Sequence, residues 1–277
     1  MALIQANFMS KCLMRTVTVN VILPVDKFTL PGQPVREKKP FKTLYLLHGI
    51  FGDHNDWITG TRIARWAQEQ NLAVVMPAGE SHFYTDDLRA GHYFSKFIGE
   101  ELVQMTRDMF PLSTKREDTF IGGLSMGGYG ALINGLKFPE TFGCVVALSA
   151  GLILGRVDHL VDDVNAPYFV RKGYIEDCFG PAEKIIGSDS DYKALLLKDL
   201  KAKKELPKLY FACGTEDGLI DANRDYVAFL KKNGVECTFI EAPGVHDWNF
   251  WDEHIKLAMD WLPLEGKTDG INSGNVK

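Results

Sequence analysis

Short apolar runs alternate with helical patterns over most of the chain, and this alternation restricts the possible folds more than any other feature. The apolar runs cover residues 43–47, 72–76, 119–124, 144–148, 209–213 and 237–241, and the helical patterns cover 61–70, 96–109, 126–137, 220–233 and 248–262. Apolar strands that alternate with helices are typical of a parallel sheet covered on both faces. The sequence therefore predicts an α/β fold with a mostly parallel sheet and helices on both faces.

The N-terminal segment differs from this pattern. Residues 17–23 alternate and are β-branched, which predicts a strand, and residues 3–9 are its expected hairpin partner. Residues 24–40 are rich in proline and charge and are predicted to form a loop. A hairpin is therefore expected before the parallel part of the sheet.

The domain organisation follows from the length and from one break in the alternation. The chain has 277 residues, enough for one large α/β domain, which we expect to span 1–277. Residues 151–207 lose the regular pattern and contain Gly-Pro and scattered aromatic residues. They are expected to form a small cap-like insertion over the carboxyl edge of the sheet. The polar residues 264–277 are expected to form a flexible tail.

Charge and composition exclude several classes of partner. A formal net charge of -5 with dispersed Lys and Arg disfavours binding to nucleic acid or to an anionic membrane. No apolar run approaches 18 residues, and the first residues lack the basic and apolar regions of a signal peptide. The five cysteines form no CxxC or Cys/His cluster, which is typical of reduced thiols in a cytoplasmic protein. The sequence leaves both a monomer and a homo-oligomer open.

The strand at 119–124 leads directly into a G-x-S-x-G motif formed by Gly123, Ser125 and Gly127. In this motif the serine lies on a strained strand-to-helix turn, where side chains two residues before or after it would collide with neighbouring backbone. The turn directs the next N–H, that of Met126, toward a developing oxyanion. A glycine-rich helix N-cap is the alternative. The preceding strand and the following helix favour Ser125 as a nucleophile.

A second glycine motif ends the strand at 43–47. It reads His48-Gly49-Ile50-Phe51-Gly52, and its glycines would let the backbone approach a substrate carbonyl. The expected second oxyanion donor is the N–H of Ile50, with that of Phe51 next. A simple glycine turn is the alternative. His48 precedes the nucleophile in sequence and is expected to be a structural hydrogen-bonding residue.

Two carboxylates, Glu216 and Asp217, follow the strand at 209–213 and would lie at the same sheet edge as the nucleophile. In the α/β-hydrolase order the acid comes between the serine and the histidine. Asp217 is favoured because Gly218 follows it at the last turn position before the helix. The alternative is a carboxylate that only stabilises the helix N-terminus, and Asp221 is a weaker candidate of that kind.

His246 is the expected base because it lies on the loop that follows the last strand, at the same carboxyl edge. A histidine on a loop can move enough to take and return the serine proton. His254 lies within the last helical pattern beside an apolar line and is expected on the helix surface. The other histidines have no setting of this kind.

Residues 53–56 read Asp-His-Asn-Asp, a composition that could bind a metal. No matching cluster occurs elsewhere in the sequence, and hydrolysis by a serine needs no metal. We expect a solvated loop here, and neither a metal nor another cofactor.

These motifs together resemble the esterase D-type esterases of the α/β-hydrolase superfamily, and within them the bacterial tributyrin esterases. The resemblance runs from about residue 20 to 262 and rests on Leu-Leu-His-Gly (46–49), His-Asn-Asp-Trp (54–57), Gly-Leu-Ser-Met-Gly-Gly-Tyr-Gly (123–130), Cys-Gly-Thr-Glu-Asp (213–217) and Gly-Val-His-Asp-Trp (244–248). It implies a triad of Ser125, Asp217 and His246, with Ile50 and Met126 as oxyanion donors. It also implies that Phe51, Trp57, Tyr84 and Trp248 lie near the substrate, although Trp57, Tyr84 and Trp248 could equally be packing aromatics.

The expected activity is hydrolysis of short-chain carboxylic esters, from acetyl to butyryl, with sugar-linked acetyl or feruloyl esters as further substrates. An S-formylglutathione hydrolase-like thioesterase and an acyltransferase would use the same triad. The S-formylglutathione hydrolases usually show Ser-Gly-Leu-Thr-Cys where this chain has His-Gly-Ile-Phe-Gly. A non-catalytic binding module would not need an intact triad in the correct order. The expected partner is therefore a small-molecule ester.

Overall fold

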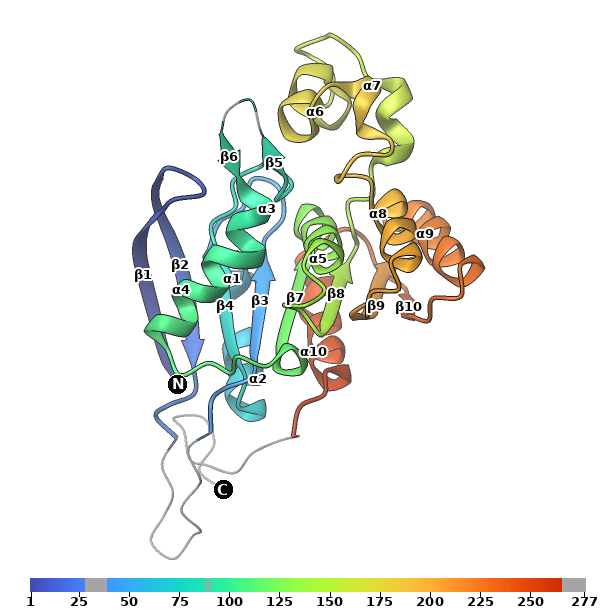
Figure 1. Ribbon diagram of the computed structural model, residues 1–277. Helices are drawn as coiled ribbons and strands as arrows, with labels where there is room; N and C mark the ends of the chain where they lie inside the picture. Colours follow the sequence, from blue (N-terminus) through green and yellow to red (C-terminus); the bar gives the residue numbers. More distant parts are fainter. Residues whose placement is uncertain (28–38, 88, 90, 266–277) are drawn as a thin grey trace, which may run out of the picture.

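The computed structural model describes residues 1–27, 39–87, 89 and 91–265 (Figure 1). Within these residues the main sheet has eight strands in the order β1-β2-β4-β3-β7-β8-β9-β10. The strands are β1 Ala2–Ser10, β2 Arg15–Leu23, β3 Thr43–Leu47, β4 Ala73–Pro77, β7 Thr119–Leu124, β8 Cys144–Leu148, β9 Lys208–Gly214 and β10 Thr238–Ala242. Strands β3, β4 and β7 to β10 pair in parallel, while β2 is antiparallel to β1 and β4. The predicted α/β fold is confirmed.

The N-terminal hairpin is also confirmed. Its two strands pair over their whole length, from Ala2 opposite Leu23 to Ser10 opposite Arg15. Side chains of β1 alternate between exposed and partly buried, because β1 is the edge of the sheet and only one of its faces packs on the core. The expected loop at 24–40 lies largely outside the described residues.

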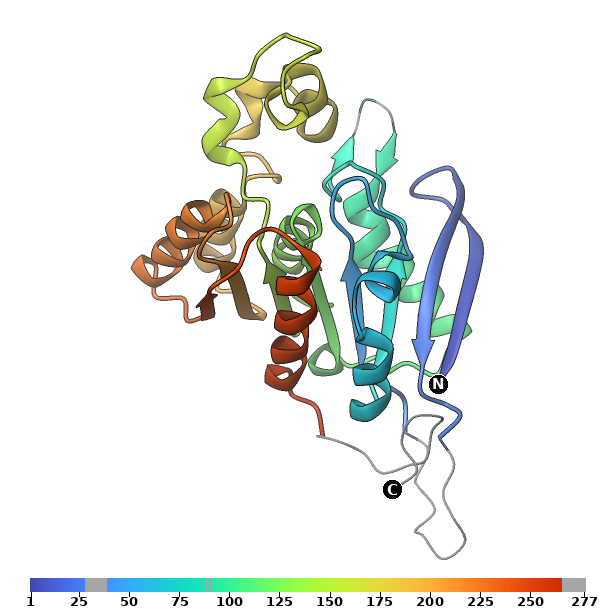
Figure 2. The same cartoon turned by 180° about the vertical axis from the view of Figure 1, so that it is seen from behind.

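Helices cover both faces of the sheet, as Figures 1 and 2 show from opposite sides. The α-helices of the described residues are α1 Asp56–Gly60, α2 Ile63–Gln70, α3 Phe94–Lys96, α4 Leu102–Met109, α5 Met126–Lys137, α6 Lys172–Phe179, α7 Ala182–Ile185, α8 Tyr192–Lys201, α9 Ile220–Lys232 and α10 Trp248–Trp261. Helices α4, α5, α8 and α9 pack on one face, and α1, α2 and α10 pack on the other. A π-helical stretch, Phe97–Glu101, joins α3 to α4, so the single helix expected at 96–109 has three parts.

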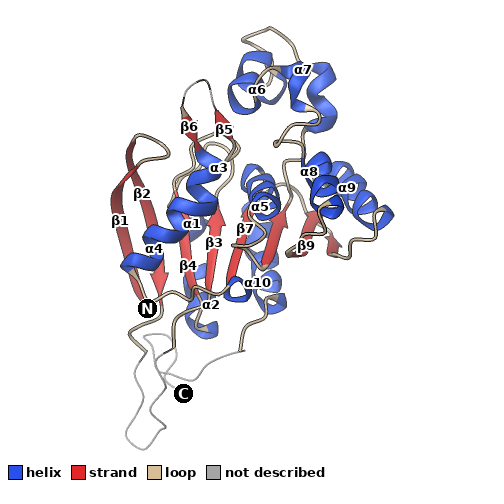
Figure 3. Cartoon of the chain, in the orientation of Figure 1, coloured by secondary structure: helices blue, strands red, loops and turns tan. Residues whose placement is uncertain are grey.

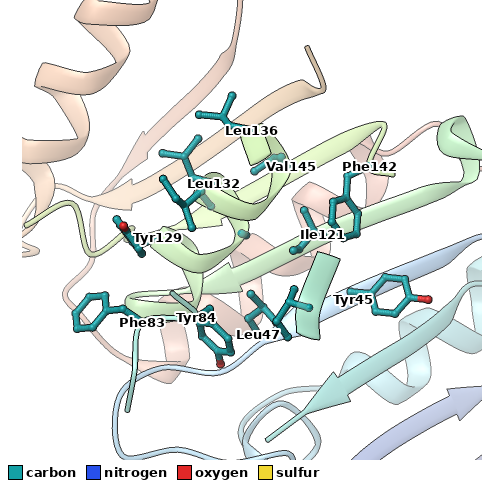
Figure 4. Close-up of a cluster of buried hydrophobic side chains, with 14 of the residues drawn as sticks. Tyr45, Leu47, Phe83, Tyr84, Ile121, Tyr129, Leu132, Leu136, Phe142 and Val145 are labelled. Atoms are coloured by element: carbon teal, nitrogen blue, oxygen red, sulfur yellow. The ribbon is translucent and has the colours of Figure 1, made fainter. Parts of the chain in front are cut away.

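Each face of the sheet carries its own hydrophobic cluster. The cluster under α5 includes Tyr45, Leu47, Ile121 and Leu132, all fully buried, and Figure 4 shows them between the helix and the strands. The cluster on the other face is built around Trp57 and residues of α2 and α10. The central strands are therefore buried on both sides, which explains their continuous apolar sequences.

The irregular segment after β8 has two structural parts. Helices α6 and α7, with a short β5–β6 hairpin (Asp86–Asp87 and His92–Tyr93) nearby, lie beyond the carboxyl ends of the central strands (Figure 3). Helix α8 instead packs against α5 in the layer that covers the sheet. The insertion over the sheet edge is thus shorter than the expected 151–207, because α8 is the helix that connects β8 to β9.

Most of the expected tail, residues 266–277, lies outside the described residues. Among the helices that the structure does describe, none combines the length and the apolar character that crossing a membrane requires.

Candidate active site

The turn between β7 and α5 places Ser125 above the carboxyl edge of the sheet. Its backbone has φ 52° and ψ -117°, a strained conformation for a residue other than glycine. The flanking glycines make the turn possible, because a Cβ on Gly123 would lie 2.4 Å from the carbonyl oxygen of Gly127. A Cβ on Gly127 would lie 2.4 Å from the carbonyl oxygen of Leu47. Both glycines of the motif are therefore required by contacts with backbone that cannot move aside.

Three side chains from separate loops meet at this edge in one hydrogen-bonded chain. Ser125 follows β7, Asp217 follows β9, and His246 follows β10. The distance from Ser125 Oγ to His246 Nε2 is 2.9 Å, and that from His246 Nδ1 to Asp217 Oδ2 is 2.8 Å. Because the Asp217 carboxylate can only accept, Nδ1–H donates to it, and Nε2 is left to accept the serine hydroxyl proton.

The environment of this chain favours an ionised acid beside an accessible base. The Asp217 side chain is 1% exposed and that of His246 is 35% exposed. Burial alone would raise the pKa of Asp217, but hydrogen bonds from His246, Ser149 and the Leu219 N–H outweigh it and hold the pKa below its ordinary value. Asp217 therefore carries a negative charge next to the imidazole throughout the neutral pH range.

Residues 48–52, the loop expected to supply an oxyanion donor and called the oxyanion loop below, lie against the turn that carries Ser125. The position of a Cβ on Gly49 is 3.8 Å from the Cβ of Ser125. Met126 is the first residue of α5, so its N–H has no carbonyl one turn earlier to accept it. The N–H of Phe51 donates to Ser81 Oγ at 3.2 Å. Of the two donors expected from this loop, Phe51 is therefore engaged elsewhere and Ile50 remains.

Comparison with known proteins is consistent with this arrangement. A model of the family described as "Putative esterase" matches residues 10–262. The chain belongs to this esterase family. An acetyl esterase of Caldicellulosiruptor saccharolyticus is 44% identical over 262 residues, which cover 95% of this chain and 98% of that protein.

Two solved structures from Staphylococcus aureus are also similar to the esterase. FphF, a fluorophosphonate-binding serine hydrolase with substrate bound, has a TM-score of 0.81 at 34% identity, over 94% of this chain and 98% of that one. The S-formylglutathione hydrolase FrmB has a TM-score of 0.80 at 34% identity with the same coverage. The esterase is a carboxylic-ester hydrolase with the α/β-hydrolase fold, as the sequence resemblance implied.

Two aromatic residues expected near the substrate are buried in the packing of the esterase. Tyr84 is fully buried in the cluster of Figure 4, and its hydroxyl donates to the His48 carbonyl at 3.0 Å. Trp57 is 1% exposed, and its indole N–H donates to the Leu47 carbonyl at 2.9 Å. Of the two alternatives that the sequence left open, the structure shows packing for both residues, and their side chains hold the carbonyls of Leu47 and His48.

His48 has the structural role that the sequence predicts. Its Nδ1–H donates to the Gly49 carbonyl at 2.6 Å, and its Nε2 accepts the Gly79 N–H at 2.8 Å. Burial lowers the pKa of His48, which keeps the ring neutral and preserves both hydrogen bonds. The ring therefore fixes the start of the oxyanion loop.

The other two expected aromatic residues have different surroundings. Phe51 is 78% exposed, and its ring contacts that of Tyr168 from the insertion at a centroid distance of 4.9 Å. Trp248 is half-buried and packs between Trp57 and Trp251. It lines a hollow of about 700 Å³, together with Thr59, Gly60, Thr61, Arg62, Asn249, Asp252 and Glu253, and that lining includes no member of the hydrogen-bonded chain.

Ser149, which the sequence analysis did not single out, lies at the end of the strand next to the one that precedes Asp217. It follows β8, is fully buried, and has a φ of 44°. The only sequence signal is its position at the end of an apolar strand, a position it shares with Ser125. A nearby serine at a strand end could have been noted on that ground.

The rival acid and base residues are engaged differently. Glu216 accepts the Gly244 N–H at 2.7 Å, and Asp221 is exposed and pairs with Arg224 at 3.3 Å. His254 is 3% exposed and stacks on Phe250 at a centroid distance of 3.9 Å. The expectation of a surface position for His254 is wrong, because the apolar stripe of α10 is wide enough to bury it.

The segment at 53–56 forms a hydrogen-bonded turn before α1. The Asp53 carboxylate accepts the Asn55 N–H at 2.7 Å, and the Asp56 carboxylate accepts the Asp53 N–H at 3.2 Å. In the described part of the chain, no group of three or more His, Cys, Asp and Glu side chains is placed to hold a metal ion.

Proposed function

We propose that the esterase acts through an acyl-enzyme, with Ser125 as nucleophile, His246 as general base and Asp217 as the residue that orients the base. The supporting observation is the continuous hydrogen-bonded chain that joins the three side chains at 2.8 and 2.9 Å. Ser125 Oγ attacks the ester carbonyl carbon while its proton passes to His246 Nε2. The imidazolium formed in this step is stabilised by the buried Asp217 carboxylate.

The developing oxyanion would be bound by the N–H groups of Ile50 and Met126. When the tetrahedral intermediate collapses, the leaving alcohol takes the proton from His246, and the acyl group remains on Ser125. A water then gives its proton to His246 and attacks the acyl carbonyl. This second step releases the carboxylic acid and returns the proton to Ser125.

We propose acetyl to butyryl esters as the preferred substrates. The 44% identical relative is an acetyl esterase. The insertion offers no lipid-facing helix, because α6 turns Ile175 and Cys178 inward and leaves Lys172 and Asp177 exposed. The Phe51–Tyr168 pair stands next to the oxyanion loop, so its rings would limit the length of the acyl group there.

A series of 4-nitrophenyl esters from acetyl to decanoyl tests this proposal. Each buried methylene stabilises binding by about 0.8 kcal/mol, so a pocket with room would give a kcat/KM that rises steadily with chain length. We expect an optimum at or below butyryl and a fall beyond it. Phe51→Ala should shift the optimum to longer chains, and Met14→Ala, which removes an equally exposed side chain at the hairpin turn, should not. An optimum at octanoyl or longer would refute the short pocket.

Thioester hydrolysis and acyl transfer are tested in the same assay. Similarity to FrmB, an S-formylglutathione hydrolase, is the observation that favours a thioester substrate. Addition of S-formylglutathione to the series ranks its kcat/KM against acetyl esters. Addition of an alcohol measures transfer through the ratio of new ester to free acid, and we expect free acid to dominate.

We propose a reducing, cytoplasmic location for the esterase. The supporting observation is that all five cysteines are free thiols, with Cys144, Cys178 and Cys213 buried. Buried thiols of this kind serve as small apolar side chains. Thiol titration of the denatured protein isolated without reductant should give five thiols, and a lower number would contradict this proposal.

A further inference from the structure

We propose that Ser149 is a positioning residue of the esterase, which holds the Asp217 carboxylate in the orientation that aligns His246. This inference rests on the proposed function of the triad and adds a fourth side chain to it. Ser149 lies on the turn after β8, between the turns that carry the nucleophile and the acid.

The turn that carries Ser149 is held to the neighbouring strand β9. Its N–H donates to the Ala212 carbonyl on β9 at 2.7 Å. Its φ of 44° is unusual for a residue with a Cβ. The backbone strain is the same for serine and alanine, so it does not explain the hydroxyl.

The hydroxyl of Ser149 connects two groups that flank the base. Its oxygen accepts the indole N–H of Trp251 at 3.2 Å. The hydroxyl also lies close enough to the Asp217 carboxylate to lower the pKa of that group. Trp251 also packs its ring against His246 in a T-shaped contact, with centroids 4.8 Å apart. Ser149 is thus linked to the acid directly and to the base through Trp251.

This connection has two consequences for the triad. The carboxylate accepts hydrogen bonds from the Leu219 N–H and His246 and has the Ser149 hydroxyl beside it, so its rotation is restricted and Oδ2 faces the imidazole. The Ser149 hydroxyl also lowers the pKa of the carboxylate, which weakens the attraction of the carboxylate for the imidazolium. Its removal would leave a less constrained carboxylate that stabilises the imidazolium more strongly.

The other titratable groups that face this pair are Cys213 on β9 and Asp247 at the start of α10, within the described residues. Cys213 is fully buried and lies next to both Ser149 and Asp217. Burial raises the pKa of the Cys213 thiol to about 12, so it stays neutral over the range of an activity profile.

Ser149→Ala is the decisive variant, with Ser95→Ala as its matched control. Ser95 is also fully buried, and its hydroxyl donates to Asn134 Oδ1 at 2.5 Å, away from the triad. We expect Ser149→Ala to lower kcat on the order of 10-fold or more with KM unchanged. We also expect the acid limb of the kcat/KM profile to move to higher pH by about 0.3 to 1 pH unit, because a more basic carboxylate keeps the imidazole protonated longer. Ser95→Ala should change neither kcat nor the acid limb of the kcat/KM profile.

A second variant and a spectroscopic readout separate this inference from the proposed function. Trp251→Phe keeps a ring beside His246 but removes the donor to Ser149, and a smaller shift in the same direction is expected. The low-field proton NMR resonance of the His246–Asp217 hydrogen bond should move in Ser149→Ala and stay in Ser95→Ala, whether or not the enzyme turns over esters. An unchanged resonance and an unchanged pH profile in Ser149→Ala would overturn the positioning role.

Discussion

At the scale of single residues, the acid of the triad is distinguished by its hydrogen bonds more than by its place in the sequence. Asp217 and Glu216 are adjacent, yet only Asp217 reaches the imidazole. Glu216 turns to the Gly244 N–H and Thr215, and hydrogen bonds from these groups lower the pKa of its carboxyl. One carboxylate therefore binds the His246 imidazole, and the other binds the backbone of the loop that carries His246.

Replacement of these two carboxylates gives opposite results. Asp217→Asn should lower kcat by about 10³ to 10⁴, because the amide cannot stabilise the imidazolium and favours the wrong tautomer of His246. Glu216→Gln keeps an acceptor for the Gly244 N–H and should leave kcat within about a factor of three. Steady-state kinetics on an acetyl ester measure both. A greater loss in Glu216→Gln than in Asp217→Asn would assign the acid to Glu216.

At the scale of elements, α5 can pack closely against β3 and β7 because glycines stand at the points of contact. A Cβ on Gly127 would lie 2.4 Å from the Leu47 carbonyl oxygen and 2.6 Å from that of His48. A Cβ on Gly130 would lie 2.4 Å from the Tyr84 ring. The helix thus approaches Leu47 and His48 closely, as the proposed oxyanion site formed by the N–H groups of Met126 and Ile50 requires.

Gly127→Ala tests this close approach. The added methyl must push α5 away from Leu47, which should lower the unfolding midpoint and reduce kcat/KM by at least about 10-fold. Gly173→Ala is the matched control, since Gly173 lies in α6 and a Cβ there meets nothing within 4 Å. That control should gain about 0.5 to 1 kcal/mol of stability. Equal behaviour of the two variants would contradict the packing argument.

The elements, and the meeting of Ser125, Asp217 and His246 at one sheet edge, could be predicted from the sequence because local patterns encode them. The strands 119–124 and 144–148 match the structure to the residue, since continuous apolar runs mark strands buried on both faces. The contacts of Ser149 with Trp251 and of Tyr168 with Phe51 could not be predicted, because these partners come from distant segments. His254 was misplaced for a similar reason, since the packing of α10 on the sheet decides which helix positions are buried.

At the scale of the whole molecule, we propose that the chain folds as one domain. The cluster on the α5 face contains Val19 from the N-terminal hairpin and Leu230 from α9, so residues far apart in sequence share one core. The hairpin is also anchored to the helical layer by Glu101. Its carboxylate accepts the Ser10 hydroxyl at 2.5 Å and the Lys11 N–H at 2.7 Å.

The Glu101 anchor predicts a pH-dependent stability. Burial would raise the pKa of Glu101, but hydrogen bonds from Ser10, Lys11 and Cys12 hold it below its ordinary value. A carboxyl whose pKa is lower in the folded than in the unfolded state stabilises the fold above the unfolded pKa, and this stability is lost as the pH falls through the folded pKa. Because the chain shares one core, urea unfolding should show one cooperative transition. The urea midpoints of wild type and Glu101→Gln should differ most above about pH 5, and the difference should shrink toward pH 3. Glu100→Gln, at the exposed neighbour, should show no such difference, and a pH-independent gap for Glu101→Gln would contradict the anchor.

The central claim, that Ser125 is the nucleophile activated by His246, is tested most directly by mass spectrometry after reaction with a fluorophosphonate. The account predicts one phosphonate adduct per chain, located on Ser125 by peptide mapping, no adduct in Ser125→Ala, and slow labelling in His246→Ala because the base is missing. An adduct on another serine, or unchanged labelling in Ser125→Ala, would contradict it.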